Sequence, residues 1–156
     1  MPAVTRWLTG QPATLEEYVE RYGTPDRLAS TLVAETSDAV VGDLFVSVET
    51  PYAQIEVRAE ATGTMAVVGW LVDPAYAGQG LATEAAAALL RICFEGFGVR
   101  RVVAGAFAGN AASLRVMEKL GMRVESREVR GALHRELGWV DKVETAILVD
   151  EWQAGC

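Results

Sequence analysis

Six stretches of the chain are rich in β-branched residues or alternate apolar with polar positions, which are the patterns typical of β-strands. They are residues 30–37, 40–49, 64–72, 100–108, 122–131 and 143–151. The first two are joined by Ser37 and Asp38, so we expect them to form a hairpin. Residues 54–63 alternate less cleanly, and we interpret them as an extended edge or a loop.

Three other stretches carry helical signals. Thr14 stands three residues before Glu17, and this capping box predicts a short helix from about Leu15 to Arg21 that ends near Gly23 and Pro25. The other two are an amphipathic helix over 80–97 and a helix over 110–121 that begins at a capping asparagine and stops at a glycine. Helices therefore follow the third and fourth strands, and this order predicts a mixed α/β fold with helices on the faces of one sheet.

The length and composition fit one globular domain over residues 1–156. No apolar run approaches the ~20 residues of a membrane span, and the first residues lack a secretion signal. Cys93 and Cys156 have no metal-binding or redox spacing. We therefore expect a cytoplasmic protein with no metal site and no membrane partner.

The net charge of −7 argues against a nucleic-acid partner, because such proteins normally present a basic face. An acidic chain is compatible with a cationic amine as substrate. The alternative reading is that the acidic residues serve solubility alone.

A glycine-rich turn, VDPAYAGQGLATEA at 72–85, separates the third strand from the helix after it. Unpaired N–H groups and the helix dipole make such a helix start suitable for a phosphate group. The turn does not fit a Walker loop, because no lysine follows, and it does not fit the dinucleotide fingerprint, because Thr83 replaces the third glycine. A purely structural turn is the remaining alternative.

Two motifs resemble the GNAT N-acetyltransferases. The turn matches the family's coenzyme A segment, Arg/Gln-x-x-Gly-x-Gly/Ala, at Gly80 and Ala82, and departs from it at Ala77. The helix over 110–121 matches a second family motif, with the residues Asn110, Ser113, Glu118, Lys119, Leu120, Gly121 and Met122. The chain resembles most the RimJ/RimL branch, the ribosomal-protein N-terminal acetyltransferase-like group. The similarity lies in the short sequences GDL at 42–44 and GLATEA at 80–85, and in Trp139 and Asp141.

The resemblance covers about residues 31–152 and implies the GNAT-like acyl-CoA N-acyltransferase fold, with a mostly antiparallel sheet flanked by helices. The family's first strand is not expected here, because the chain starts with neither the strand nor the helix that usually precede the part matching residues 3–23. A sheet edge without that strand would be open to pairing with a second copy, so a homodimer is one hypothesis.

The resemblance also implies acetyl-CoA as co-substrate, with its pyrophosphate on main-chain N–H groups between Ala77 and Thr83. Its pantetheine arm would lie in a gap where the 64–72 strand parts from the 100–108 strand, and a backbone N–H there could polarise the thioester carbonyl. The implied cofactor-binding residues are Leu71, Val72, Ala77, Gly78, Gln79, Gly80, Leu81, Ala82, Thr83, Asn110, Ser113 and Arg115.

Many family members protonate the leaving thiolate with a tyrosine seven residues after the asparagine, where this chain has Met117. Ser113 is the remaining hydroxyl on that helix, so we assign it as general acid or hydrogen-bond donor, with Asn110 beside it. The alternative is that both residues only cap the helix. No general base is assigned, since Val67 stands where the branch often has an acid; the candidates are Glu56, Glu60, His134, Asp141 or a chain of waters.

We therefore expect an acetyl-CoA-dependent N-acetyltransferase in which a primary amine attacks the thioester directly. The alternative is a non-catalytic acyl-CoA-binding or regulatory domain, and a nucleotide-binding module is disfavoured because both nucleotide fingerprints fail. We expect the acceptor pocket in the N-terminal helix region and in loops at 50–64 and 130–142.

Overall fold

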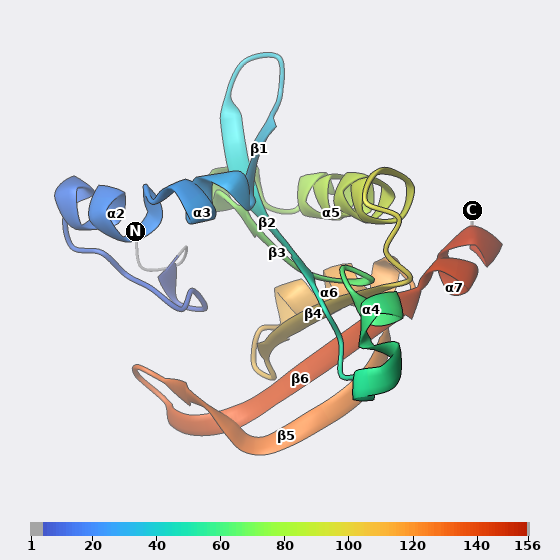
Figure 1. The fold of residues 1–156 in the computed structure, drawn as a ribbon. Helices are drawn as coiled ribbons and strands as arrows, with labels where there is room; N and C mark the ends of the chain where they lie inside the picture. Colours follow the sequence, from blue (N-terminus) through green and yellow to red (C-terminus); the bar gives the residue numbers. More distant parts are fainter. Residues whose placement is uncertain (1–4, 156) are drawn as a thin grey trace.

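The computed structural model describes residues 5–155, which form a six-stranded sheet with helices around it (Figure 1). The strand order is β1-β2-β3-β4-β6-β5, and every neighbouring pair is antiparallel except β3 and β4. The elements are α2 (Leu15–Tyr22), α3 (Pro25–Ala29), β1 (Thr31–Glu35), β2 (Val40–Glu49), η1 (Ile55–Val57), α4 (Arg58–Ala61), β3 (Met65–Val72), η2 (Pro74–Tyr76), α5 (Leu81–Arg91), η3 (Ile92–Gly96), β4 (Arg101–Phe107), α6 (Ala111–Lys119), β5 (Arg123–His134), β6 (Gly138–Leu148) and α7 (Val149–Ala154).

These elements confirm the predicted mixed, mostly antiparallel α/β fold. The β1–β2 hairpin forms where it was expected, and the Thr14 side chain caps α2 by accepting from the Glu17 N–H at 3.1 Å. Within the described residues no strand precedes β1, so β1 is an edge of the sheet. Cys156 lies outside the described part of the chain.

Two local predictions were wrong. Residues 54–63 are helical rather than extended, because Arg58, Ala59, Glu60 and Ala61 all favour helix and their pattern offers no continuous apolar face to a sheet. The last strand ends at Leu148 instead of continuing to residue 151. There the Glu151 carboxylate accepts from the Leu148 N–H at 2.7 Å, and this contact caps α7.

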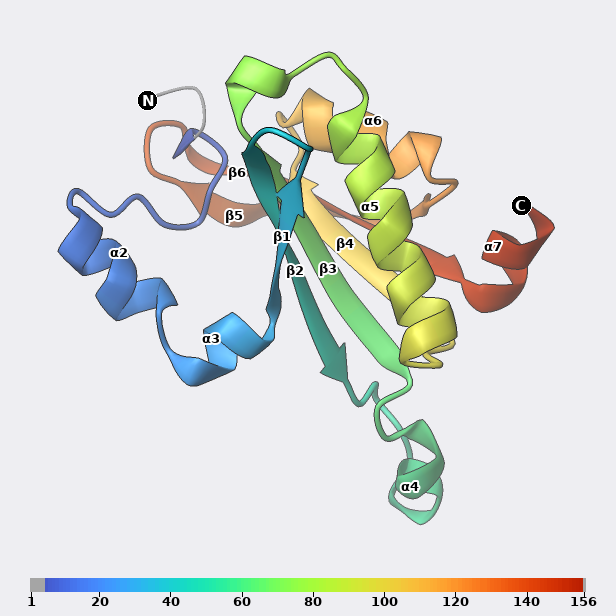
Figure 2. The same ribbon diagram turned by 90° about the horizontal axis from the view of Figure 1, so that it is seen from above.

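The main core lies between one face of the sheet and the helices α5 and α6 (Figure 2). Its largest helix residues are Leu89, Leu90 and Phe94, all less than a tenth exposed. They pack on the sheet residues Val68, Val102, Ala104 and Ile147. Because side chains alternate along a strand, the residues between these point to the opposite face, away from α5.

Cys93 is fully buried in this core, and its burial raises the pKa of the thiol to about 11. A thiol with so high a pKa is unreactive at neutral pH. Among residues 5–155 no three His, Cys, Asp or Glu side chains cluster as metal ligands would. In the same range no helix has both the length and the apolar character needed to cross a membrane.

Candidate active site

The parallel strands β3 and β4 separate partway along their length. They pair only at Met65↔Arg101, Ala66↔Val102 and Val67↔Val103. Beyond these pairs β3 continues to Val72 alongside β2, and β4 continues to Phe107 alongside β6. The gap that we expected between these two strands is therefore present, and each strand has an unpaired inner edge.

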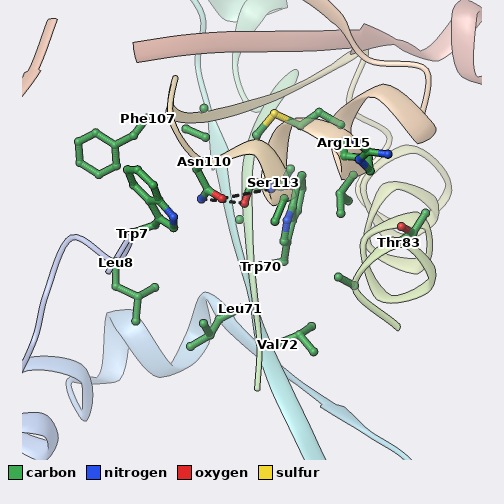
Figure 3. A pocket seen from close by; sticks show the side chains of 18 of the residues that line it. Trp7, Leu8, Trp70, Leu71, Val72, Thr83, Phe107, Asn110, Ser113 and Arg115 are labelled. Carbon is green, nitrogen blue, oxygen red and sulfur yellow. Dashed lines mark hydrogen bonds between the residues drawn. The ribbon is translucent and has the colours of Figure 1, made fainter. Parts of the chain in front are cut away.

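A cavity of about 780 Å³ occupies this gap, and residues from both faces of the sheet line it. Trp70 and Ala106 line it from the face that α5 covers, whereas Gly69 and Gly105 line it from the other face. Figure 3 shows Trp7 and Phe107 at one end, Thr83 and Arg115 at the other, and Asn110 with Ser113 between them. The cavity is thus a passage through the sheet.

The glycine turn forms the mouth of this passage on the α5 side. Gly78 and Gly80 have φ angles of 78° and 83°, and an added Cβ at either would meet no atom within 4 Å. These are left-handed conformations that favour glycine, and the space above them is open. A bound group can therefore approach the backbone here more closely than at any residue with a side chain.

The unpaired N–H groups of the turn span a shorter stretch than the sequence suggested. The N–H of Ala77 donates to the Pro74 carbonyl at 3.1 Å, and that of Thr83 donates to the Gly80 carbonyl at 3.0 Å. Between them, the N–H groups of residues 78–82 find no acceptor among the described residues. Five consecutive donors at a helix start form a site for an anion.

Asn110 and Ser113 lie at the start of α6 and form a reciprocal pair. The Asn110 Oδ1 accepts from the Ser113 N–H at 3.3 Å, and the Asn110 Nδ2 donates to the Ser113 Oγ at 3.1 Å. Since the Oγ receives one hydrogen bond from Asn110, its own proton is free to be donated into the cavity. Met117, one turn further on, is buried, lines the cavity and has no acidic proton.

The structure brings nearly all of the predicted cofactor residues to this cavity. Leu71, Val72, Ala77, Gly78, Gly80, Leu81, Ala82, Thr83, Asn110, Ser113 and Arg115 line it. Gln79 does not line it and contributes only to the turn. Arg115 lies at the same end as the glycine turn, where its charge suits an anion, and Lys119 also lines the cavity.

None of the four side chains considered as general base lines the cavity. His134 is buried, and both of its ring nitrogens are engaged: Nε2 donates to the Arg6 carbonyl at 2.8 Å, and Nδ1 accepts from the Glu136 N–H at 3.1 Å. Asp141 accepts from the Arg130 N–H at 3.0 Å in the β5–β6 ribbon. Glu56 and Glu60 lie exposed on η1 and α4.

Sequence reasoning missed most of the residues that line the end of the cavity away from the glycine turn. Of the stretches expected to form the acceptor pocket, 130–142 contributes Ala132 and Lys142, from strands rather than a loop, and 50–64 contributes no lining residue. The missed residues there are Trp7, Leu8, Thr9, Phe107 and Glu144. Period-two alternation in 143–151 could have placed Glu144 on a sheet face, but only the strand order shows which face holds the cavity.

Lys142 has two carboxylate partners at this end. Its Nζ lies 3.2 Å from Glu128 Oε1 and 3.4 Å from Glu144 Oε2. Burial lowers the pKa of Lys142, but the hydrogen bonds and charges of Glu128 and Glu144 outweigh it and raise that pKa above its usual value. Lys142 therefore stays charged at neutral pH, between two acids.

Comparison with known proteins places this geometry in context. The family model described as an acetyltransferase (GNAT) domain matches residues 1–123. The uncharacterized N-acetyltransferase YnaD of Bacillus subtilis (strain 168) is 36% identical over 85 residues, which are 54% of this chain and 49% of YnaD. The chain thus spans about half the length of this curated relative.

Solved structures show the same fold. A GNAT-family acetyltransferase from Bacillus anthracis has a TM-score of 0.73 and 26% sequence identity, covering 94% of this chain and 81% of its own. RimJ of Mycobacterium smegmatis, solved in complex with CoA-disulfide, has a TM-score of 0.73 and 24% identity, covering 96% of this chain and 72% of its own.

Proposed function

Because this chain belongs to the acetyltransferase (GNAT) family, we propose that it transfers an acetyl group from acetyl-CoA to a primary amine. The observation that carries the proposal is the passage through the sheet, with an anion site at one mouth and a hydroxyl donor inside. A thioester held in the gap would have its acyl carbon open to an amine that enters from the opposite face. One domain over residues 1–156 is part of this proposal.

The residues present fit coenzyme A. The N–H groups of residues 78–82 would receive the pyrophosphate, and Arg115 and Lys119 would add positive charge nearby. The inner edge of β3 at Leu71 and Val72 would pair with the amide groups of the pantetheine arm. RimJ of M. smegmatis, with the same fold, is described in complex with CoA-disulfide, which supports this assignment.

The chemistry requires a held thioester, a neutral amine and a proton for the leaving thiolate. The amine nitrogen bonds to the acyl carbon and gives up its extra proton to water, the C–S bond breaks, and sulfur takes a proton through the Ser113 hydroxyl, which is reprotonated in the same step. Asn110 would set the direction of that proton, because its Nδ2 occupies an acceptor position on the Ser113 Oγ. The proton that Ser113 regains comes from solvent.

A second candidate function is acyl-CoA binding without turnover. It is favoured by Met117, which stands where many relatives of this family have the acidic tyrosine. In that case the passage would hold acetyl-CoA, and Asn110 and Ser113 would only cap α6.

One experiment separates the two candidates. Acetyl-CoA should raise the unfolding temperature in either case, because binding to the native state stabilises it. Release of free coenzyme A is then followed with phenethylamine, spermidine and a short peptide with a free N-terminus. Amine-dependent release supports acetyl transfer; binding of acetyl-CoA with no release for any amine supports the non-catalytic alternative.

The sheet edge at β1 supports a further part of the proposal, a homodimer. Val33 is 60% exposed and Val40 is 65% exposed along this hairpin, so an apolar strand edge faces solvent. A second copy could pair there. Light scattering tests this directly, and a monomeric mass across the micromolar range would contradict it.

A further inference from the structure

We propose that Glu144 is the acceptor-side carboxylate, which binds the incoming amine and takes the proton that its nitrogen loses. This inference rests on the proposed acetyl transfer and names a residue for the step that the sequence left unassigned. Among residues 5–155, Glu144 is the one acidic side chain that lines the passage.

The register of the sheet puts Glu144 beside the gap. On β6 it pairs with Gly105 of β4, two residues beyond Val103, where the β3–β4 pairing ends. Paired residues share a face, so Glu144 lies on the face away from α5, where an acceptor would enter. Gly105 contributes no side chain of its own, and the Lys142 Cε lies over it, 3.3 Å from where a Cβ would stand. Gly69 of β3, also two residues past the last pair, leaves the same face open on the other side.

The charge at this end favours a cation. Glu128 and Glu144 share the single ammonium group of Lys142, so the three groups together carry one net negative charge. A carboxylate can accept about four hydrogen bonds, and Lys142 uses one position on Glu144. The Glu144 side chain is 37% exposed, so an amine can reach the rest.

Other carboxylates nearby are less suited to this role. Asp43 pairs with Leu71 on the face away from α5, but it does not line the passage. The positive charge of Arg27 already acts as its counter-charge. Asp141 accepts from the backbone of Arg130. The remaining wall at this end is apolar and aromatic, with the rings of Trp7 and Phe107 5.9 Å apart. An ammonium group that enters past this wall meets Glu144 as its counter-charge.

The proton balance of the step is complete. The amine nitrogen forms the new N–C bond, the C–S bond breaks, and sulfur leaves with the proton from Ser113. An amine that arrives as ammonium first gives one proton to solvent through Glu144, and after attack the extra proton on nitrogen passes to a Glu144 oxygen and then to solvent. Ser113 regains its proton from solvent. No oxidant or metal is required.

The test compares Glu144→Gln with Glu128→Gln. Both variants remove one carboxylate from Lys142, but only Glu144 lines the passage. We expect kcat/KM for the fastest amine of the panel to fall about 100-fold in E144Q and at least tenfold less in E128Q, which removes a nearby charge but no group that lines the passage. Acetyl-CoA affinity should stay within twofold of wild type in both. E144D, which keeps a shorter carboxylate, should retain more activity than E144Q.

Three outcomes would overturn the inference and can be told apart. If wild type transfers acetyl groups and E144Q remains within twofold of it, Glu144 has no such role while the proposed function stands. If wild type binds acetyl-CoA but releases no coenzyme A with any amine, the proposed function fails and takes this inference with it. Equal losses in E144Q and E128Q would point to Lys142 rather than to Glu144.

Discussion

The Asn110 Nδ2 donates to the Ser113 Oγ at 3.1 Å, while the Oδ1 of the same amide accepts from the Ser113 N–H at 3.3 Å. One side chain thus caps α6 and also directs a hydroxyl group. An N-cap alone needs only the Oδ1 contact. The Nδ2 contact goes beyond what a helix cap needs, and it is the contact that the proposed role of Ser113 uses.

Ser113→Ala removes the hydroxyl but leaves the Asn110 cap in place. We expect kcat for acetyl transfer to fall about 10- to 100-fold, because the thiolate loses its proton donor. The KM for acetyl-CoA should change less than threefold. Steady-state release of coenzyme A measures both values, and a kcat within twofold of wild type would remove Ser113 from the mechanism.

Asn110→Asp keeps the acceptor that caps α6 and replaces the Nδ2 donor with a second acceptor. A carboxylate there should accept the Ser113 proton and so withhold it from the thiolate. We expect kcat to fall to the level of Ser113→Ala while the unfolding temperature stays near that of wild type. Asn110→Ala should in addition lose about 1 kcal/mol of unfolding free energy with the cap.

A matched variant shows what the loss of a cap does alone. Thr14 caps α2, away from the passage. Thr14→Ala should lower stability and leave kcat unchanged. If Asn110→Asp has wild-type kcat, the Nδ2 contact has no part in catalysis.

Gly80→Ala should weaken acetyl-CoA binding at least tenfold. The φ angle of 83° costs an L-residue about 1–2 kcal/mol, and the new methyl group would stand in the open space above the turn. Isothermal titration measures the affinity. Gly98→Ala is the control, since Gly98 has a φ of 66° and the same open surroundings but does not line the passage. Equal affinity losses in the two variants would contradict a role for the turn in binding.

Glu125 makes the unfolding free energy of the protein depend on pH in the acidic range. Its carboxylate accepts from Arg101 Nη1 at 2.9 Å and from Arg123 Nη2 at 2.7 Å. The hydrogen bond from Arg101 is the main cause that lowers the pKa of Glu125 from 4.5 to about 2. Because the pKa of Glu125 is lower in the folded than in the unfolded chain, its ionised carboxylate stabilises the fold at pH values above the unfolded-state pKa of about 4.5. That contribution is lost as pH falls from about 4.5 through about 2.

Glu125→Gln tests this contribution. We expect a loss of about 1–2 kcal/mol of unfolding free energy at pH 7, after allowance for solvent screening of a partly exposed group. Urea unfolding at pH 7 and pH 3 should show the difference shrinking at the lower pH. Glu20→Gln on the exposed helix α2 is the comparison, with little change at either pH.

Eleven of the twelve residues that the sequence offered for acetyl-CoA line the passage, because local patterns determine where most of them lie. A strand, two glycines and a helix start are consecutive in 72–85, and Asn110 to Ser113 is a single turn of helix. Such features need no knowledge of distant contacts. The helical stretch within 54–63 was missed because it is short, polar and only weakly periodic, so its hydrophobic pattern gave no clear signal. The helix propensity of its residues decided the structure instead.

The acceptor end was not predictable in the same way. Trp7, Phe107 and Glu144 line this end from three remote parts of the chain. The strand order β4-β6 brings Phe107 and Glu144 together, and Trp7, from the segment before α2, packs on Phe107 and His134. His134, chosen from the sequence as the lone histidine, instead ties the β5 end to the Arg6 carbonyl. Which residues face a site depends on strand order, and alternation alone does not give that order.

The short β3–β4 pairing has a consequence for how the protein responds to its substrate. The three β3–β4 residue pairs join the two halves of the sheet, one made of β1, β2 and β3 and the other of β4, β6 and β5. An exposed strand edge at the rim of a sheet attracts other chains, whereas these two edges face each other inside the molecule. A pantetheine arm in the gap would act as a short seventh strand and fasten the halves together. We expect amide hydrogen exchange near Val67 and Val103 to slow most when acetyl-CoA binds.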